Sequence, residues 1–319
     1  MSSIPGRRYF SGISDRTGFK VDMLEKVYRI MTILGRLQEE QHLSDRLSLK
    51  GGTAIQGLMF GFRRLSVDID LNYVGSVRKD EMQKDRLEIR KALGYILKDM
   101  GYIVEQPPVA YAEEQFFLHY SNVGGGRDRL KLEINYLERL PVLGTEVKKL
   151  GHPFDDLGDV RARSYRPEEL FAGKARALIV RSTPRDLYDA YLFATSKSPF
   201  DWDLWRKVSI FYLVMQSVDI RELSPAAIDA LTDVEARNQL LPLVSNRERL
   251  DLGLMKDRVR PIADRLLKFS KSEEEYLDKF YSDLVSSPNV LFGGMPVSPG
   301  LEDHPSIEWR LHQLREKGR

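Results

Sequence analysis

The spacing of hydrophobic and polar positions changes along this chain and divides it into two halves. In the first half, short segments alternate between apolar and polar residues, a period of two that is typical of β-strands with one buried face. Strands are predicted within 47–49, 67–73, 102–105, 116–120 and 129–136, with a glycine-rich hairpin tip at 124–126 and amphipathic helices at 21–41 and 79–100. The N-terminal half therefore predicts a small mixed sheet accompanied by helices.

From residue 167 onward the apolar positions recur with the helical period instead. Helices are predicted at about 168–181, 184–195, 202–217, 225–243, 246–269 and 273–286, then a loop rich in proline and glycine at 288–305 and a short basic helix. The predicted fold class is α/β (α+β), with a mixed-sheet domain at 1–160 followed by an all-helical domain at 161–319. A ligand site is expected in the cleft between the two domains, where binding clefts commonly form.

The composition excludes several kinds of protein and site. The chain has 319 residues, of which 42% are hydrophobic and 30% charged, as in soluble globular proteins. No run reaches the roughly 18 apolar residues that a membrane span requires, and residues 1–8 lack the apolar core of a signal peptide. Cysteine is absent, which excludes disulfides and thiolate zinc sites, and the five histidines show no metal-ligand spacing. We therefore expect a cytoplasmic protein that does not enter membranes.

The net charge of +2 does not indicate a broad nucleic-acid-binding surface. Basic residues are concentrated locally, however, at 161–185 and at 127–131. These positions flank the candidate residues described below and fit contacts to a triphosphate or to RNA phosphates. Solvated helix faces are the alternative interpretation.

Two acidic residues, Asp68 and Asp70, are separated by a single apolar residue in a predicted strand. The strand period of two places both carboxylates on the same face, where they repel each other unless a positive charge lies between them. Carboxylate oxygen suits Mg²⁺ or Mn²⁺. The pair therefore indicates a metal site, with a solvated strand face as the alternative.

A double glycine, Gly51-Gly52, ends the preceding short apolar strand and is followed by Thr53, where a helix is expected to begin. Glycine allows the backbone to approach a ligand closely, and a helix N-terminus offers unpaired N–H groups to a phosphate. A phosphate-binding turn that precedes paired carboxylates is the arrangement of a metal-dependent nucleotide site.

The strings 50–54 (Lys-Gly-Gly-Thr-Ala) and 64–71 (Arg-Leu-Ser-Val-Asp-Ile-Asp-Leu) resemble the AbiEii/AbiGii-type toxins of the polymerase-β-type nucleotidyltransferase superfamily. The resemblance covers roughly residues 20 to 200. It implies a nucleotidyltransferase toxin of a toxin–antitoxin system, with Mg²⁺ (or Mn²⁺) as cofactor and an NTP as substrate. It also implies that Lys50, Gly51, Gly52 and Thr53 contact the nucleotide phosphates.

The superfamily carries a third carboxylate on a later strand, and Glu133 matches it. Alternation within 130–136 places Glu133 on a polar face with Lys131 and Asn135. An exposed polar face on an edge strand is the alternative. Ser66 lies two residues before Asp68, so strand periodicity predicts that its hydroxyl also lies on the acid-bearing face, beside the metal and the triphosphate.

A second matching segment follows at 166–178, where Lys174 occupies the apolar stripe of a predicted helix. Lysine is rarely buried without a partner. The resemblance implies that Lys174 is directed at the triphosphate; a stem lying along the apolar surface with its head group in water is the alternative.

The next segment resembles the family's Arg-Asp-Leu-x-Asp motif, and its residues are Arg185, Asp186 and Asp189, preceded by Arg181. Thr183 is predicted to cap this helix, with a proline in its first turn. Asp186 is expected either to orient Lys174 or to serve as scaffolding, and Asp189 likewise. The two arginines are assigned to nucleotide binding.

These residues together predict metal-dependent transfer of NMP from an NTP to an acceptor. The catalytic residues are expected to be Asp68, Asp70, Glu133, Lys174 and Asp186, and the metal ligands Asp68, Asp70 and Glu133. The resemblance implies an RNA acceptor, the 3′ end of tRNA, growth inhibition and a cognate antitoxin. Transfer to a small molecule or a protein, and nucleotide binding without transfer, are the alternatives.

Overall fold

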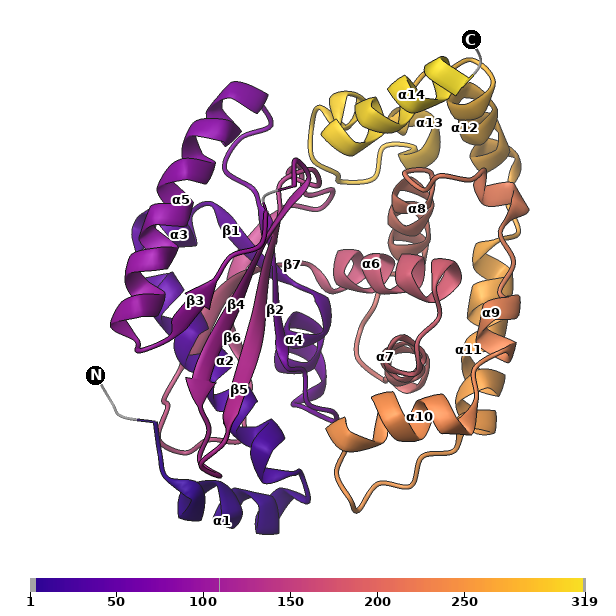
Figure 1. The fold of residues 1–319 in the computed structure, drawn as a ribbon. Coiled ribbons are helices and arrows are strands. Elements are labelled where there is room, and N and C mark those ends of the chain that lie inside the picture. The colour runs from indigo at the N-terminus through magenta and orange to yellow at the C-terminus, as the bar shows by residue number, and fades with distance from the viewer. Residues whose placement is uncertain (1–3, 109, 318–319) are drawn as a thin grey trace. The chain divides into compact units, whose positions relative to one another are not determined.

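The computed structural model describes residues 4–108 and 110–317, which form two compact units (Figure 1). The first unit comprises the chain up to Arg139 together with Thr145–Tyr165 and Leu240–Leu250. The second comprises Leu140–Gly144, Arg166–Gln239 and the chain from Asp251 onward. Leu140–Gly144 therefore belongs to the second unit although it lies within the sequence of the first, and Leu240–Leu250 belongs to the first unit although it lies within the sequence of the second.

In the described part of the first unit, seven strands form one sheet with the order β3-β4-β5-β2-β1-β7-β6. Neighbouring strands are antiparallel except for the pairs β2/β5 and β1/β7, which are parallel. The predicted mixed sheet is thus confirmed. The strands are β1 (Leu47–Lys50), β2 (Asp68–Tyr73), β3 (Ile103–Glu105), β4 (Glu113–Ser121), β5 (Arg127–Asn135), β6 (Thr145–Leu150) and β7 (Val160–Tyr165).

Strands β6 and β7 were not expected from the sequence. β6 is an edge strand with mainly exposed or half-exposed residues, so it lacks the apolar alternation of a half-buried strand. In β7 the alternation is carried by Val160, Ala162 and Ser164, of which only the first is strongly hydrophobic, with arginines between them. Ser164 pairs with Leu49 of β1, and α2 packs against β7; neither tertiary contact is visible in the local pattern.

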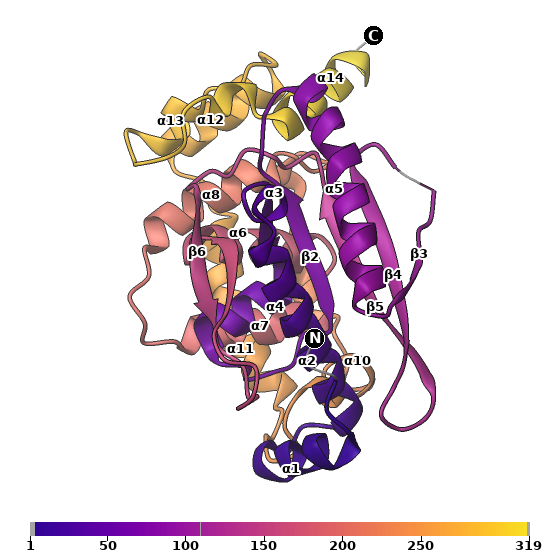
Figure 2. The same ribbon diagram turned by 90° about the vertical axis from the view of Figure 1, so that its left-hand side faces the viewer.

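Helices α2 (Val21–Glu39), α3 (Gln41–Ser44) and α5 (Lys79–Asp99) lie along one face of the sheet, and α1 (Arg7–Thr17) packs on α2 (Figure 2). Leu34 and Leu37 of α2 line a small void together with Leu49 of β1 and Leu71 of β2. This face therefore forms the core of the unit. Because side chains alternate along β2, Asp68 and Asp70 point to the opposite face.

Helix α4 (Gly51–Ile55) follows β1 directly and continues as a π-helical turn, Gln56–Phe60. α4 packs against both β1 and β2. Its start at Gly51, two residues before the expected Thr53, places the double glycine in the first turn of the helix.

The second unit is helical, as predicted, and α6 (Pro167–Val180) packs against both α7 (Pro184–Thr195) and α8 (Trp202–Leu213). Phe171 and Phe193 stack with ring centroids 3.8 Å apart, and Trp205 stacks on Phe171 at 5.1 Å. The remaining helices are α9 (Ala226–Asp229), α10 (Asp233–Gln239), α11 (Leu252–Leu266), α12 (Lys271–Tyr281), α13 (Pro288–Phe292) and α14 (Pro305–Lys317).

Several predicted helix bounds were wrong in this unit. The helix expected at 225–243 is divided at Thr232, whose backbone N–H and hydroxyl both bond to Glu235 and start α10 anew. The helix expected from 246 begins at Leu252, where the Asp251 carboxylate accepts the Leu254 N–H at 2.8 Å. The loop expected at 288–305 contains the short α13.

The segment Leu240–Leu250 forms part of the first unit mainly through hydrogen bonds to backbone groups. Leu65 N–H donates to the Leu243 carbonyl at 2.7 Å, Arg64 forms an isolated bridge with Val244, and the Ser245 hydroxyl donates to the Thr17 carbonyl.

In the described chain, no helix combines the length and apolar character that crossing a membrane requires.

Candidate active site

The predicted acidic residues are brought together by strand register in the first unit. β2 and β5 run parallel, so that Asp68 pairs with Lys131 and Asp70 pairs with Glu133. On the other side of β2, Lys50 of β1 is the antiparallel partner of Asp70. A row of charged side chains, Lys50, Asp70 and Glu133, therefore crosses three adjacent strands on the face opposite α2.

Glu133 makes two polar contacts on this face. Its Oε2 lies 2.9 Å from Lys131 Nζ and accepts a hydrogen bond from Gln115 Nε2 at 3.3 Å. Lys50 Nζ lies 3.9 Å from Glu138 Oε2. Sequence reasoning noted Lys131 only as a flanking base and missed Gln115, which comes from β4 and reaches Glu133 only through the register of the sheet.

The pKa of the Asp70 carboxyl group is raised in this arrangement. Burial raises the pKa of its carboxyl group, the charges of Asp68 and Glu133 raise it further, and Lys50 and Lys131 oppose the shift only in part. Burial tends to lower the pKa of the Lys131 ammonium group. The hydrogen bond and ion pair with Glu133, together with the smaller effects of the charges of Asp70 and Asp68, outweigh burial and raise this pKa. The face carries three carboxyl groups, of Asp68, Asp70 and Glu133, beside two lysines, Lys50 and Lys131.

Gly51 and Gly52 lie directly against these side chains. Gly51 has φ = 68°, and a β-carbon placed on it would lie 2.3 Å from Asp70 Oδ2. A β-carbon on Gly52 would lie 2.7 Å from Ser66 Oγ and 2.8 Å from Arg64 Nη2. At Gly51 the left-handed φ and the Asp70 carboxylate both favour glycine, whereas a side chain at Gly52 would displace the ends of Ser66 and Arg64.

Thr53, predicted as a phosphate contact, has a different local role. Its side chain is fully buried, and its hydroxyl donates to the Asp68 carbonyl at 2.7 Å. This bond ties the first turn of α4 to the start of β2. The hydroxyl thus fixes the spacing between the glycine turn and the acids.

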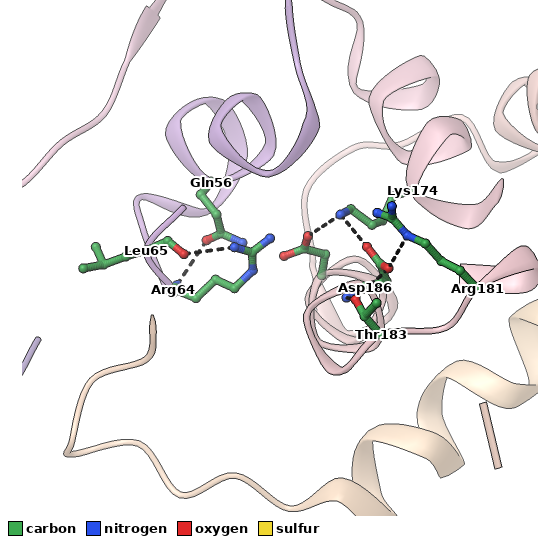
Figure 3. Close-up of polar contacts among 8 residues, drawn as sticks. Gln56, Arg64, Leu65, Lys174, Arg181, Thr183 and Asp186 are labelled. Atoms are coloured by element: carbon green, nitrogen blue, oxygen red, sulfur yellow. Dashed lines mark hydrogen bonds and ion pairs between the residues drawn. The ribbon is translucent and has the colours of Figure 1, made fainter. Parts of the chain in front are cut away.

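Arg64 is a buried residue of this site that sequence reasoning quoted but did not single out. Its Nη1 donates to the Leu65 carbonyl at 2.9 Å and its backbone N–H donates to Gln56 Oε1 at 3.2 Å (Figure 3). Ser66 is buried beside Gly52. Ser66 precedes the first residue of β2, so its position follows from this contact and not from the predicted strand periodicity.

Lys174 of the second unit is buried and paired. Its Nζ lies 2.8 Å from Asp186 Oδ1 and 3.0 Å from Asp189 Oδ2, and both acids are on α7. All three residues are less than 10% exposed, and Figure 3 shows the Lys174 ammonium group directed at Asp186. The alternative in which the Lys174 head group reaches water is therefore wrong.

The start of α7 has the predicted capping geometry. The Asp186 N–H donates to Thr183 Oγ1 at 3.3 Å, the Thr183 hydroxyl donates to Asp186 Oδ2 at 2.7 Å, and Pro184 is the first helical residue. Arg181 Nε, exposed, lies 3.3 Å from Asp186 Oδ2, while Arg185 is half-buried. Capping thus fixes the carboxylate that holds Lys174.

Asp186 is ionised at any physiological pH. Burial tends to raise the pKa of its carboxyl group, but the charge and hydrogen bond of Lys174, with Arg181 and Thr183, outweigh burial and hold it well below its usual range. Removing Lys174 would leave this charge buried without its main partner.

The structure thus groups Lys50, Gly51, Gly52, Ser66, Asp68, Asp70 and Glu133 in the first unit, and Lys174, Arg181, Asp186 and Asp189 in the second. Within the described ranges, no three His, Asp or Glu side chains already form a metal-binding cluster. Glu133 is engaged with Lys131 instead.

Comparison with solved structures supports the fold. The structure resembles MenT4, a nucleotidyltransferase toxin from Mycobacterium tuberculosis H37Rv, with a TM-score of 0.62 and 18% sequence identity over 97% of this chain and 99% of that one. At this identity the likeness concerns the fold.

A curated protein, elongation factor 4 from Oleidesulfovibrio alaskensis, is 24% identical over 169 residues, which make up 53% of this chain. The match spans only 27% of the length of that protein. The family model described as "Nucleotidyl transferase AbiEii toxin, Type IV TA system" matches residues 32–277. This match covers most of the chain, including both groups of candidate residues, and the chain therefore belongs to the AbiEii family of nucleotidyltransferase toxins of type IV toxin–antitoxin systems.

Proposed function

We propose that this toxin transfers the NMP group of an NTP to an RNA acceptor in the cytoplasm, with the 3′ end of tRNA as the acceptor and Mg²⁺ or Mn²⁺ as the cofactor. Growth inhibition by this reaction would be relieved by the cognate antitoxin. The observation that carries the proposal is the register that places Asp70 opposite Glu133, with Asp68 on the same face and Gly51 against the Asp70 carboxylate.

The residues of this face fit a divalent cation. Asp68, Asp70 and Glu133 supply carboxylate oxygens, the donor type that Mg²⁺ and Mn²⁺ prefer. Burial first, and then the charges of Asp68 and Glu133, raise the pKa of the Asp70 carboxyl group, and a bound cation would offset this effect by favouring the ionised form. When bound, the cation would neutralise charge on the phosphoryl oxygens and make the acceptor hydroxyl more acidic.

The protein's own groups have defined tasks in the reaction. The acceptor oxygen forms a bond to the α-phosphorus, the bond between the α-phosphorus and its bridging oxygen breaks, and pyrophosphate leaves. Glu133 is proposed to receive the proton of the acceptor hydroxyl. Gly51 and Gly52, which have no side chains, allow the triphosphate to approach the backbone beside Lys50.

The second unit is proposed to contribute to nucleotide binding. Lys174 would contact a phosphate group, with Asp186 and Asp189 holding its ammonium group in position. Arg181, whose guanidinium is exposed, is proposed as a further phosphate contact. The burial of Lys174 between two carboxylates supports a fixed orientation for this charge.

Incubation of the purified protein with NTPs labelled at the α-phosphate and with total RNA tests this proposal. We expect label in the tRNA fraction, dependence on Mg²⁺ or Mn²⁺, and no transfer by Asp68→Ala or Asp70→Ala. Label that appears on protein or on a small molecule, and not on RNA, would replace RNA with that acceptor. Undiminished transfer by both alanine variants would refute the site.

A further inference from the structure

A cavity of about 310 Å³ lies in the second unit between the start of α8 and the middle of α11. It is separate from the candidate residues described above. Its walls are formed by the side chains of Trp202, Asp203, Trp205, Arg206, Pro261, Ile262 and Arg265. A volume of this size accommodates a small molecule or a single nucleotide.

The wall that α11 contributes contains a proline inside the helix. Pro261 lies within α11 and has no N–H, so the Asp257 carbonyl loses its usual donor four residues on. The helix nevertheless continues through Pro261 to Leu266. Pro261 and the next residue, Ile262, both line the cavity at this turn.

One wall of the cavity is aromatic. Trp202 is 39% exposed and packs edge-to-face on Trp205 with ring centroids 5.4 Å apart, and on Phe200 at 4.8 Å. These contacts hold the Trp202 ring in a fixed orientation. A partly exposed, rigidly held indole is a suitable surface for stacking a flat π-system.

Trp205 forms the buried part of the same wall. In the part of the chain that the structure describes, its indole Nε1 is buried without a hydrogen-bond partner. A buried donor without an acceptor costs free energy. A ligand acceptor that reached it would remove this cost.

The rim of the cavity carries charges of both signs. Within the described residues, neither the Asp203 carboxylate nor the Arg265 guanidinium has a hydrogen-bond or ion-pair partner, and both residues are exposed. Arg206, in contrast, is fixed: its Nε and Nη2 each bond to Glu273 at 2.8 Å. The rim thus presents one carboxylate and one guanidinium to a ligand.

From this combination we infer that the cavity binds an unpaired guanine nucleotide of the RNA acceptor, an inference that rests on the proposed function. The base stacks on Trp202, and its two adjacent N–H donors bond to the two oxygens of Asp203, which only accepts hydrogen bonds. Arg265 bonds to the phosphate. Uracil presents carbonyl oxygens on either side of a single N–H and is disfavoured beside the carboxylate.

Tryptophan fluorescence measures binding at this cavity directly. The chain has three tryptophans, and Trp309, on α14, lies outside the cavity lining. In a Trp309→Phe background, GMP and a guanosine-containing single-stranded oligoribonucleotide should quench the fluorescence saturably. UMP should bind about tenfold more weakly, and inorganic phosphate should not quench. Equal quenching by UMP and GMP, or none by either, would overturn the assignment.

Transfer kinetics separate this inference from the proposed function. Trp202→Ala should raise KM for RNA by about tenfold or more and leave KM for the NTP unchanged. Trp309→Ala, which removes another exposed tryptophan, is the matched control and should change neither. Asp203→Asn and Arg265→Gln alter only exposed side chains and test the same site if Trp202→Ala folds poorly.

Each failure has its own signature. Wild-type protein that labels no RNA refutes the proposed function. Wild-type protein that labels RNA while Trp202→Ala, Asp203→Asn and Arg265→Gln all keep its KM refutes the cavity as an RNA site. Binding of GMP without binding of the oligoribonucleotide would assign the cavity to a free nucleotide and overturn the RNA assignment. Quenching by peptides of the antitoxin and not by nucleotides would overturn it as well.

Discussion

Asp70 of β2 and Glu133 of β5 occupy directly opposite positions on two adjacent parallel strands. The two acids are 63 positions apart in the chain, and the sheet brings them together on the face that α2 does not cover. Two carboxylates on neighbouring strands repel each other, and like charges in this arrangement destabilise a sheet. A cation bound between them, as proposed above, would offset this repulsion.

The first prediction concerns Asp70→Asn. We expect transfer to fall below detection, since the metal loses a carboxylate. We expect the metal-free protein to melt at the wild-type temperature or slightly above it, because the substitution removes a half-buried carboxyl group whose pKa is raised by burial, Asp68 and Glu133. Thermal unfolding in EDTA and the transfer assay check the two parts. Active Asp70→Asn protein would show that the carboxylate is structural.

Gly51→Ala tests the close approach of the glycine turn to Asp70. The substitution combines a left-handed φ of 68° with a β-carbon 2.3 Å from Asp70 Oδ2. We expect a loss of about 2 kcal/mol or more in the free energy of unfolding, and loss of transfer because Asp70 must move.

Gly158→Ala is the matched control for Gly51→Ala. Gly158 has φ = 64° but no atom within 4 Å of an added β-carbon, so this variant isolates the backbone strain. We expect a loss of about 1 kcal/mol and full activity, measured by urea unfolding and the transfer assay. Equal behaviour of the two variants would show that contact with Asp70 is unimportant.

Much of this site follows from the local pattern of the sequence. A period of two predicts the shared face of Asp68 and Asp70, and a cap residue followed by proline predicts the start of α7. Contacts between segments that are distant in the chain cannot be predicted from the local sequence pattern. The pairing of β7 with β1 and the backbone bond from Leu65 to Leu243 depend on tertiary packing, which has no local signature in either segment.

Lys174→Met shows how the structure changes an expectation from sequence. The apolar stripe alone suggests that methionine would be tolerated. Because Lys174 pairs with Asp186 and Asp189, we expect a loss of about 3–5 kcal/mol in stability from two buried carboxylates left without this partner. Adding Asp186→Asn and Asp189→Asn should recover part of the loss in chemical unfolding.

Nucleotide binding by these variants is a separate measurement. In a calorimetric titration under conditions where both proteins remain folded, the triple variant should bind NTP at least about tenfold more weakly than wild type. Wild-type affinity would limit Lys174 to a structural role.

Glu273 gives a prediction for the pH dependence of stability. Burial tends to raise the pKa of its carboxyl group, but hydrogen bonds from Arg206 and Ser270 and the charges of Arg206 and Lys207 outweigh burial and lower it from 4.5 to about 2. Because this pKa is lower in the folded protein than in the unfolded chain, the ionised carboxylate of Glu273 stabilises the fold at pH values above about 4.5. This stabilisation is lost as the pH falls from about 4.5 to about 2. The loss amounts to at most about 3 kcal/mol.

Glu273→Gln should remove this part of the acid sensitivity. Urea unfolding between pH 6 and pH 3 should show a smaller slope for Glu273→Gln than for wild type. Glu274→Gln, which changes an exposed neighbour on the same helix, should keep the wild-type slope. An unchanged slope for both variants would mean that the ion pairs of Glu273 do not govern stability in acid.

The last prediction concerns Ser66, which lies against the glycine turn. Its hydroxyl would be 2.7 Å from a β-carbon on Gly52, and its side chain is only 7% exposed. A carboxylate at this position would place a negative charge where the triphosphate is proposed to bind and would compete with it for the cation. Ser66→Ala removes only the hydroxyl and should remain active, whereas Ser66→Asp should raise KM for the NTP by about tenfold or more.

A phosphate group on Ser66 would act in the same direction, but the burial of this side chain means that a kinase could reach it only after the turn opens. Steady-state kinetics for both variants, with thermal unfolding to confirm that each is folded, decide the matter: a folded Ser66→Asp protein with the wild-type KM would show that the nucleotide does not bind at the Gly51-Gly52 turn.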